Sequence, residues 1–199
     1  LGAVEWGYEE DGATLLAHLE KIVQYNVQSS EKEKFDGVML DIEPYISDSW
    51  KENPEEYMDR YISCMKKGYK FAQKNHLRTA ICIPRHYDNQ GLTSGLEELI
   101  KETCDEVAVM NYSCGNEIEA IRTEAALSEK YGKELHCILE FQEVGKHGLT
   151  ENKTYRNKGI DNAKETWEKL QKEYKNINVT RDYHWSRPVR EMLEEKNAD

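Results

Sequence analysis

No run of apolar residues in this chain of 199 residues is long enough to cross a lipid bilayer. Basic side chains are also scarce, because 27 lysines and arginines stand against 38 aspartates and glutamates and leave a net charge of -11. Proteins that bind nucleic acid or anionic membranes present a basic surface, so we expect neither partner. Linkers, low-complexity runs and blocks of like charge are absent as well, which favours a single domain over residues 1–199.

Cysteine and histidine patterns typical of metal sites are missing too. The five cysteines form no CxxC pair and are scattered along the chain at Cys64, Cys82, Cys104, Cys114 and Cys137. An odd, scattered set is typical of buried, reduced thiols rather than of a disulfide framework or a zinc site. The six histidines show no ligand spacing either, so we expect no metal and no other cofactor.

Short runs typical of β-strands alternate with longer runs of helical periodicity. Strands are expected over residues 35–43, 78–84, 105–112, 135–141 and 177–185, with a strand stub over 1–6. Helices are expected from a cap at Asp11 to about Tyr25, from a cap at Asn53 to about Asn75, over 94–103, 116–131 and 160–175, and after Pro188. No hairpin signal joins two strands, so the pattern predicts serial βα units and a parallel sheet.

The number of strands bears on the choice between two α/β architectures. A (β/α)8 TIM barrel has eight strands and usually about 250 residues, whereas this chain supplies five strands and a stub. We favour a barrel domain of which this chain covers about strands three to eight, with the N-terminal strands missing from it. An open, doubly wound parallel sheet is the alternative.

The stretch FDGVMLDIEPY, residues 35–45, alternates as a strand does. Its two faces are Val38, Leu40 and Ile42 on one side, and Met39, Asp41 and Glu43 on the other. The second face becomes acidic just before Pro44, which ends the ladder because proline has no N–H to donate. Asp36 lies on the opposite parity from the two acids and is expected to be structural. The alternation therefore predicts one buried face and two carboxylates delivered to the end of the strand.

Polar and aromatic side chains also follow the other predicted strands. The strand ends offer Asp41, Glu43 and Tyr45, then Arg85, His86 and Tyr87, then Met110, Tyr112 and Ser113, then Glu140 and Gln142, and last Asp182, Tyr183, His184 and Trp185. In a barrel these ends meet at one mouth, where active sites lie. Aromatic rings that stack on sugar faces and carboxyl groups that transfer protons suit carbohydrate chemistry.

Residues 36–43, DGVMLDIE, resemble the DxxDxDxE signature of glycoside hydrolase family 18, the chitinases and endo-N-acetylglucosaminidases, at the end of the fourth barrel strand. Two predicted strands later, residues 110–112 are similar to the family's Met-x-Tyr-Asp on strand six, and Trp185 falls where the family has a tryptophan after strand eight. The DIEPY form also resembles a group of bacterial family-18-like barrels. The resemblance covers most of the chain and implies a TIM barrel that acts on carbohydrate.

The resemblance also implies a role for each matching residue. Glu43 would protonate the glycosidic oxygen and then activate water, while the substrate's own 2-acetamido oxygen attacks the anomeric carbon. Asp41 would orient the acetamido group and stabilise the positive oxazolinium, Tyr112 would donate its hydroxyl to that group, and Trp185 would form the floor of the sugar subsite. The remaining expected substrate contacts are Tyr45, Met110, Glu140 and Tyr183.

Two positions depart from the family pattern. Met39 replaces the middle acid, so Asp41 lacks the carboxyl group with which it would share a proton. Ser113 replaces the aspartate after Tyr112, which removes a substrate contact. Both changes bear on recognition of the acetamido group more than on acid catalysis by Glu43.

Three alternatives remain open from the sequence. Glu43 and Glu140 could form the acid and nucleophile of a retaining glycosidase, with carboxyl groups about 5–5.5 Å apart. The chain could instead be a chitinase-like carbohydrate-binding protein without catalysis. A metal enzyme would draw its ligands from Asp41, Glu43, His86, Glu140 and His184. The chain starts at Leu1 without a signal-peptide pattern, which leaves compartment and oligomeric state open, although the resemblance favours a location outside the cytoplasm.

Overall fold

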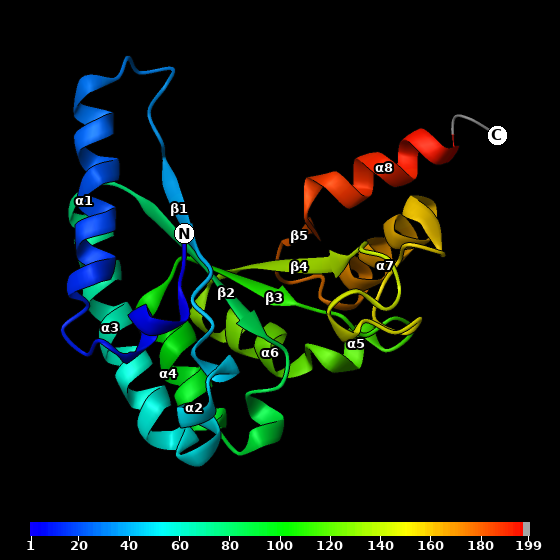
Figure 1. The fold of residues 1–199 in the computed structure, drawn as a ribbon, viewed down its shortest axis with the longest axis horizontal. Helices are drawn as coiled ribbons and strands as arrows, with labels where there is room; N and C mark the ends of the chain where they lie inside the picture. Colours follow the sequence, from blue (N-terminus) through cyan, green and yellow to red (C-terminus); the bar gives the residue numbers. More distant parts are fainter. Residues whose placement is uncertain (197–199) are drawn as a thin grey trace. The chain divides into compact units, whose positions relative to one another are not determined.

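Strands and helices alternate along the chain in the computed structural model, which describes residues 1–196 (Figure 1). The five strands are β1 (Gly37–Leu40), β2 (Arg78–Pro84), β3 (Glu106–Met110), β4 (Glu134–Glu140) and β5 (Val179–His184). They follow one another in chain order in a five-stranded sheet, and the β1–β2 and β4–β5 pairs are parallel. The predicted α/β class with a parallel sheet is therefore confirmed.

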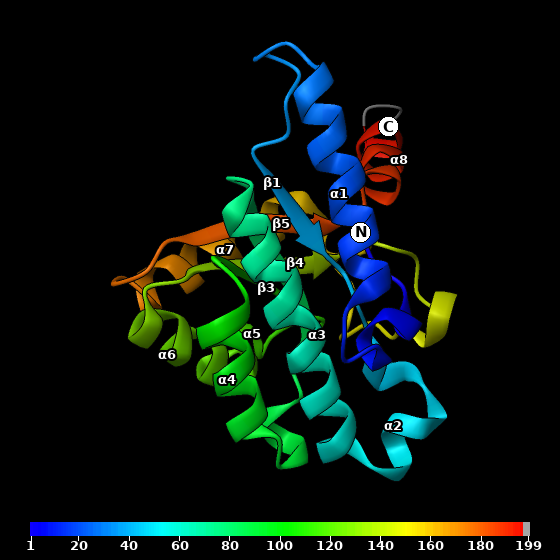
Figure 2. The ribbon, with the colours of Figure 1, turned by 90° about the vertical axis from the view of Figure 1, so that its left-hand side faces the viewer.

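The chain divides into two units, Leu1–Val107 and Ala108–Asp199, with the boundary inside β3. The helices of the first unit are η1 (Val4–Tyr8), α1 (Ala13–Gln28), η2 (Pro44–Ile46), α2 (Asp48–Glu52), α3 (Pro54–Lys74), η3 (Asp88–Gln90) and α4 (Thr93–Thr103). Figure 2 shows α3 running beside α4. The second unit contains α5 (Glu117–Ala120), α6 (Arg122–Tyr131), η4 (Lys146–Gly148), α7 (Gly159–Glu173) and α8 (Ser186–Lys196).

The longest helix, α3, begins as the sequence predicts. The Asn53 side chain accepts a hydrogen bond from the backbone N–H of Glu56 at 3.5 Å, and its amide donates to the Glu56 carboxylate at 2.7 Å. Pro54 occupies the first turn, where its missing N–H costs nothing. These contacts satisfy backbone donors that the first turn of a helix leaves without partners.

The start of α1 differs from the prediction. Its N-cap residue is Gly12, in the left-handed region at φ 66°, and not Asp11. Asp11 accepts a hydrogen bond from the Ala13 N–H at 3.2 Å, while Glu9 accepts one from the Thr14 N–H at 2.8 Å and one from the Thr14 hydroxyl at 2.7 Å. Two acids therefore share the capping that the sequence assigned to one.

The helices α1 and α3 approach each other closely at Gly68. A Cβ atom at this position would lie 2.5 Å from Cδ2 of Leu15, inside van der Waals contact. Leu15 and Leu19 are both fully buried on this side of α1. The absence of a side chain at Gly68 therefore allows these two leucines to fill the space against α3.

The acidic strand β1 is shorter than predicted and ends at Leu40. Its register with β2 runs from Gly37 opposite Arg78 to Leu40 opposite Ile81. The predicted strand over 1–6 is wrong, because residues 4–8 form the 3-10 helix η1. Leu1 alone lies along β1, where its N-terminal amine donates to the Met39 carbonyl at 2.8 Å and its carbonyl accepts from the Asp41 N–H at 2.7 Å.

One helix that the sequence predicts in the second unit is divided into two in the structure. The run predicted as a single helix over 116–131 breaks at Ile121, whose backbone is non-helical at φ -126° and ψ 19° and whose side chain is fully buried. Burial of this side chain overrides the helical pattern of the sequence at that point. The second segment, α6, ends at Gly132 in the left-handed conformation, as predicted.

The pair β4–β5 and the helix α7 form the core of the second unit. The β4–β5 register runs from Leu135 opposite Val179 to Glu140 opposite His184. The indole N–H of Trp167 on α7 donates to the Cys137 carbonyl of β4 at 2.9 Å. This contact fixes the helix against β4, and the strand register places Glu140 opposite His184 at the carboxyl ends of the two strands.

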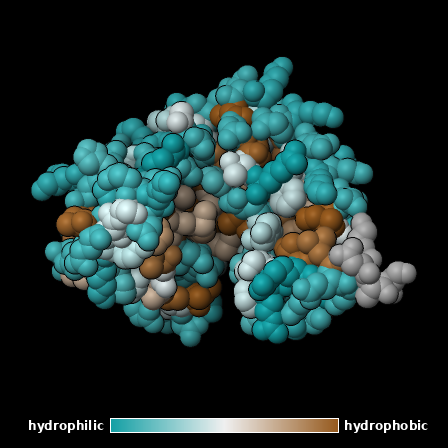
Figure 3. All heavy atoms as spheres, turned by 90° about the horizontal axis from the view of Figure 1, so that it is seen from above, coloured by the Kyte–Doolittle hydropathy of each residue, from teal (hydrophilic) through white to brown (hydrophobic). Residues whose placement is uncertain are grey.

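The surface drawn in Figure 3 is mostly hydrophilic, with hydrophobic side chains in small patches. This agrees with a mean hydropathy of -0.86 and a charged fraction of 33%. Among the described residues, no helix combines the length and the apolar character that a membrane span requires. The cysteines are reduced thiols, as predicted; Cys114 is half-buried and the others are buried.

Candidate functional site

The first unit carries the two candidate acids on the face that the sequence predicts. Val38, Leu40 and Ile42 are at most 9% exposed on the opposite face. Asp41 is exposed and Glu43 is half-buried. Since β1 ends at Leu40, both acids lie in the segment that leaves the strand rather than in the strand itself.

The Glu43 carboxylate is held by the side chain of Tyr45. The Tyr45 hydroxyl donates a hydrogen bond to Oε1 of Glu43. Burial and this hydrogen bond raise the pKa of Tyr45 well above its ordinary value, so the hydroxyl keeps its proton and remains a donor. This hydrogen bond is local, because η2 (Pro44–Ile46) turns the chain directly after Glu43.

Aromatic rings enclose Tyr45. Its ring meets that of His86 edge-on at 5.2 Å and that of Tyr87 edge-on at 5.9 Å, and Trp50 lies 5.5 Å from Tyr87. Burial, and then the charge of Arg85, lower the pKa of His86, which favours the neutral imidazole. Burial, and then the Glu43 carboxylate, raise the pKa of Tyr87 well above its ordinary value. The surroundings of Glu43 in this unit are thus largely neutral and aromatic.

The second unit carries a different carboxylate arrangement, centred on Glu140 at the end of β4. Glu140 is 2% exposed. Its Oε1 accepts the backbone N–H groups of Phe141 and Gln142, both at 2.8 Å. Its Oε2 lies 2.9 Å from Nδ1 of His184 and accepts from the Gln142 amide at 3.1 Å. These contacts occupy both carboxylate oxygens and hold the imidazole of His184 in place.

The Glu140 contacts predict a pH-dependent stability. Burial raises the pKa of Glu140, but the hydrogen bonds from His184 and Gln142 outweigh it and leave the pKa below its ordinary value of 4.5. A carboxyl group whose pKa is lowered by folding stabilises the protein above its unfolded pKa, and this stabilisation is lost as the pH falls through the folded pKa. We expect Glu140→Gln to lower the free energy of unfolding by about 1–3 kcal/mol at pH 7.

Denaturant unfolding at a series of pH values measures this effect. The difference between the wild type and Glu140→Gln should shrink as the pH falls from about 4.5 through the lower pKa of the folded protein, because the wild-type carboxyl group loses its charge over this range. The exposed Glu168 on α7 provides the control, and Glu168→Gln should leave stability almost unchanged. A difference that stays constant over the whole pH range would show that the contacts of Glu140 do not depend on its charge.

The other predicted contact residues of the second unit lie near the ends of β3 and β5. The Tyr112 ring is 6.2 Å from that of His184. Tyr183 is 47% exposed and Trp185 is 46% exposed, so both rings are accessible to a flat apolar ligand face. Met110 is half-buried at the end of β3. This unit therefore brings Tyr112 close to the Glu140–His184 pair and presents two accessible aromatic rings.

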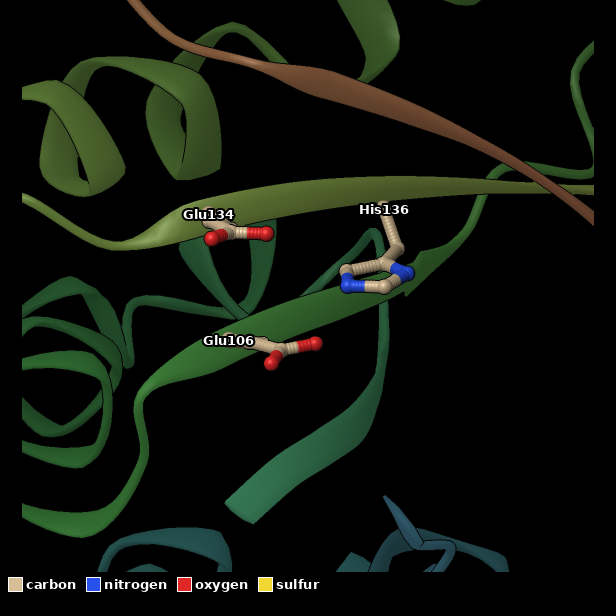
Figure 4. Close-up of side chains that lie close together, drawn as sticks. All are labelled: Glu106, Glu134 and His136. Carbon is tan, nitrogen blue, oxygen red and sulfur yellow. The ribbon is translucent and has the colours of Figure 1, made fainter. Parts of the chain in front are cut away.

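The sequence did not predict two polar groups of the second unit. Glu134 and His136 lie two positions apart on the same face of β4 (Figure 4), and Nδ1 of His136 lies 2.8 Å from the Asp182 carboxylate on β5. Glu134 and His136 each offer one atom that could ligate a metal ion; Figure 4 also labels Glu106, which belongs to the first unit. The signal that could have found the pair is the alternation of polar residues at the start of β4.

The second missed group is a buried hydrogen-bonded chain at α5. The Tyr155 hydroxyl donates to the Glu117 carboxylate and lies 2.8 Å from the Thr166 hydroxyl. Tyr155 is 2% exposed, so its hydroxyl takes part in this chain inside the second unit. Glu117 and Tyr155 are 38 positions apart, and no local pattern in the sequence links them.

Comparison with protein-family models, with curated proteins and with solved structures gave no match. Any function is therefore argued from the side chains and their geometry. The first unit offers a half-buried acid beside an exposed one, and the second offers a fixed carboxylate–imidazole pair with accessible aromatic rings.

Proposed function

We propose that this chain acts on carbohydrate and hydrolyses a glycosidic bond, with Glu43 as the proton donor. The observation that carries the proposal is the pairing of a half-buried, tyrosine-bound Glu43 with an exposed Asp41 directly after β1. The hydrogen bond from Tyr45 fixes Oε1, which leaves Oε2 available to a substrate oxygen. A positioned carboxyl group of this kind contributes about 10²–10⁴-fold to proton-transfer catalysis.

The proposed reaction is substrate-assisted, as the resemblance to glycoside hydrolase family 18 implies. The acetamido oxygen of the substrate attacks the anomeric carbon while the bond to the leaving oxygen breaks and Glu43 gives that oxygen its proton. Water then attacks the oxazolinium, and the Glu43 carboxylate takes up the proton that the water loses. Asp41, which is exposed beside Glu43, stabilises the positive charge. Tyr112 and Trp185 keep the roles that the resemblance implies, as predictions.

We also propose that the five parallel strands are part of a (β/α)8 barrel. The serial βα order and the placement of polar side chains after β1, β4 and β5 support this assignment. The retaining mechanism with Glu140 as nucleophile has weaker support. Both oxygens of Glu140 accept hydrogen bonds within the second unit, so nucleophilic attack would require breaking some of them. A role in positioning His184 suits these contacts better.

Hydrolysis of paired substrates tests the proposal. The full chain is assayed with β-linked N-acetylglucosamine oligosaccharides and with matched glucose oligosaccharides that lack the acetamido group. We expect turnover of the acetamido sugars alone, because their own oxygen supplies the nucleophile. Turnover of both sets would contradict substrate assistance and favour an enzyme nucleophile. Binding of either set without turnover would contradict hydrolysis and favour a carbohydrate-binding protein.

A further inference from the structure

The second unit contains a cleft that the proposed glycosidase does not use. It lies between α5, the segment that carries Tyr155, and α7, and encloses about 550 Å³. This volume is within the range of about 300–1,000 Å³ that is typical of small-molecule sites. The packing of α5 against α7, reinforced by a hydrogen bond of 2.6 Å from the Tyr174 hydroxyl to the Ile118 carbonyl, fixes the walls of the cleft.

A buried carboxylate lines this cleft. Glu117 is 8% exposed, and its Oε1 accepts hydrogen bonds from the Gly115 N–H at 2.8 Å and from the Tyr155 hydroxyl. Thr166, also on the lining, lies 2.8 Å from the Tyr155 hydroxyl, which has already given its proton to Glu117. The Thr166 hydroxyl also donates to the Asn162 carbonyl at 3.2 Å, so the polar chain links α7 to the carboxylate through Tyr155. Both donors act on Oε1, so Oε2 keeps its capacity to accept a ligand donor.

The charge of Glu117 indicates which donor suits Oε2. Gly115 and Tyr155 are neutral, so the printed hydrogen bonds of Glu117 bring no positive charge to its carboxylate. A hydroxyl group would add one more neutral hydrogen bond. A primary ammonium group would add a charge-assisted bond, which is roughly twice as strong, and would neutralise the carboxylate. The carboxylate of Glu117 therefore favours a ligand that carries an amine.

The rim of the cleft carries two lysines and two glutamates. Lys158 and Lys169 both line it. The Lys158 ammonium donates to the backbone carbonyl of Glu151 at 2.6 Å, and in the described part of the chain neither lysine forms an ion pair. Of the two acids, Glu119 is paired with Arg122. Glu173 therefore remains to offset the positive charge of the two lysines. The rim thus suits an anionic group at the other end of the ligand.

We propose that this cleft binds a small zwitterion, either an amino acid or a short peptide, with its ammonium group on Oε2 of Glu117 and its carboxylate at Lys158 and Lys169. The site uses none of the residues assigned to glycoside hydrolysis and does not depend on that activity. Its chemistry resembles the capture of peptide termini, in which each end of the ligand meets a fixed group of opposite character.

Calorimetric titration of the full chain tests the proposal with four probes. Trialanine carries both charges, N-acetyl-trialanine lacks the ammonium, trialanine amide lacks the carboxylate, and free alanine carries both charges at a shorter separation. We expect trialanine or alanine to bind, and the tighter of the two identifies the ligand as peptide or amino acid. Loss of the ammonium should weaken binding about tenfold or more, because a charge-assisted hydrogen bond is lost.

Two variants assign the binding to the cleft. Glu117→Gln should weaken the binding of the probes that carry an ammonium group about tenfold. It should leave the affinity for N-acetyl-trialanine unchanged. Lys169→Met should weaken the binding of trialanine more than that of trialanine amide. Because Lys169 is exposed, this variant should fold even if Glu117→Gln does not. The proposal is overturned if no zwitterionic probe binds, if N-acetylation has no effect, or if trialanine binds the Lys169→Met variant as tightly as the wild type. Glycoside turnover should be the same in both folded variants as in the wild type.

Discussion

Glu43→Gln is expected to lower the rate of glycoside hydrolysis by about 10²–10⁴-fold. Glutamine has nearly the same shape and can still accept the Tyr45 hydroxyl at its carbonyl oxygen, so the neighbourhood of the site is kept. Its amide group cannot give up a proton to the leaving oxygen or recover one from water. The loss therefore measures proton transfer and not packing. Steady-state kinetics on the β-linked acetamido oligosaccharides provide the measurement.

Two controls separate this effect from others. Tyr45→Phe removes one neutral hydrogen bond to the carboxylate and leaves the acid in place, so its effect should be no more than about tenfold. Glu52→Gln, an exposed change at the end of α2, should have no effect on the rate. Residual activity of Glu43→Gln within a factor of about three of the wild type would rule out Glu43 as the acid, because general acids contribute far more than that.

Trp167→Ala is expected to lower the free energy of unfolding by about 3–5 kcal/mol, the usual cost of removing a large buried aromatic side chain. Trp167 is 3% exposed and packs 6.5 Å from the ring of Phe141, which is fully buried. Its indole N–H also satisfies the Cys137 carbonyl inside β4. The substitution therefore leaves both a cavity and an unpaired buried acceptor between α7 and β4.

Equilibrium unfolding in urea, followed by circular dichroism, measures this loss. Trp167→Phe keeps most of the apolar volume and loses the hydrogen bond, so we expect it to cost about 1–3 kcal/mol. Glu168→Ala lies next to it on the exposed face of α7 and should stay within about 0.5 kcal/mol of the wild type. Equal stabilities for the alanine and phenylalanine variants would show that the hydrogen bond, and not the ring volume, fixes α7 on β4.

The sequence predicts the elements best where local chemistry decides them. The bounds of β2 agree with the predicted strand over 78–84, because the five residues 79–83 are apolar or small and Pro84 has no N–H to continue the ladder. The start of α3 follows from Asn53 and Pro54, and the end of α6 follows from Gly132. In each case the residue that fixes the boundary makes its contact within one turn of itself.

Predictions fail where distant contacts decide the local structure. Burial of Ile121 breaks the helix predicted over 116–131, and the sequence pattern alone does not show that this residue is buried. Within the candidate site, the alternation after β1 predicts the common face of Asp41 and Glu43. The hydrogen bonds of Glu140 to His184, across 44 positions, depend on the register of β4 and β5, which no local pattern specifies.

The contact between the Glu140 carboxylate and the His184 imidazole also has a consequence for the entropy of ligand binding. His184 is the last residue of β5 and lies opposite Glu140 in the register. The contact of their side chains therefore holds the end of this strand, which would otherwise fray. Tyr183 and Trp185 flank this pinned residue and are both nearly half exposed. Since the backbone of these residues is already ordered, stacking of a ligand on either ring costs little conformational entropy of the protein beyond that of the side chain itself.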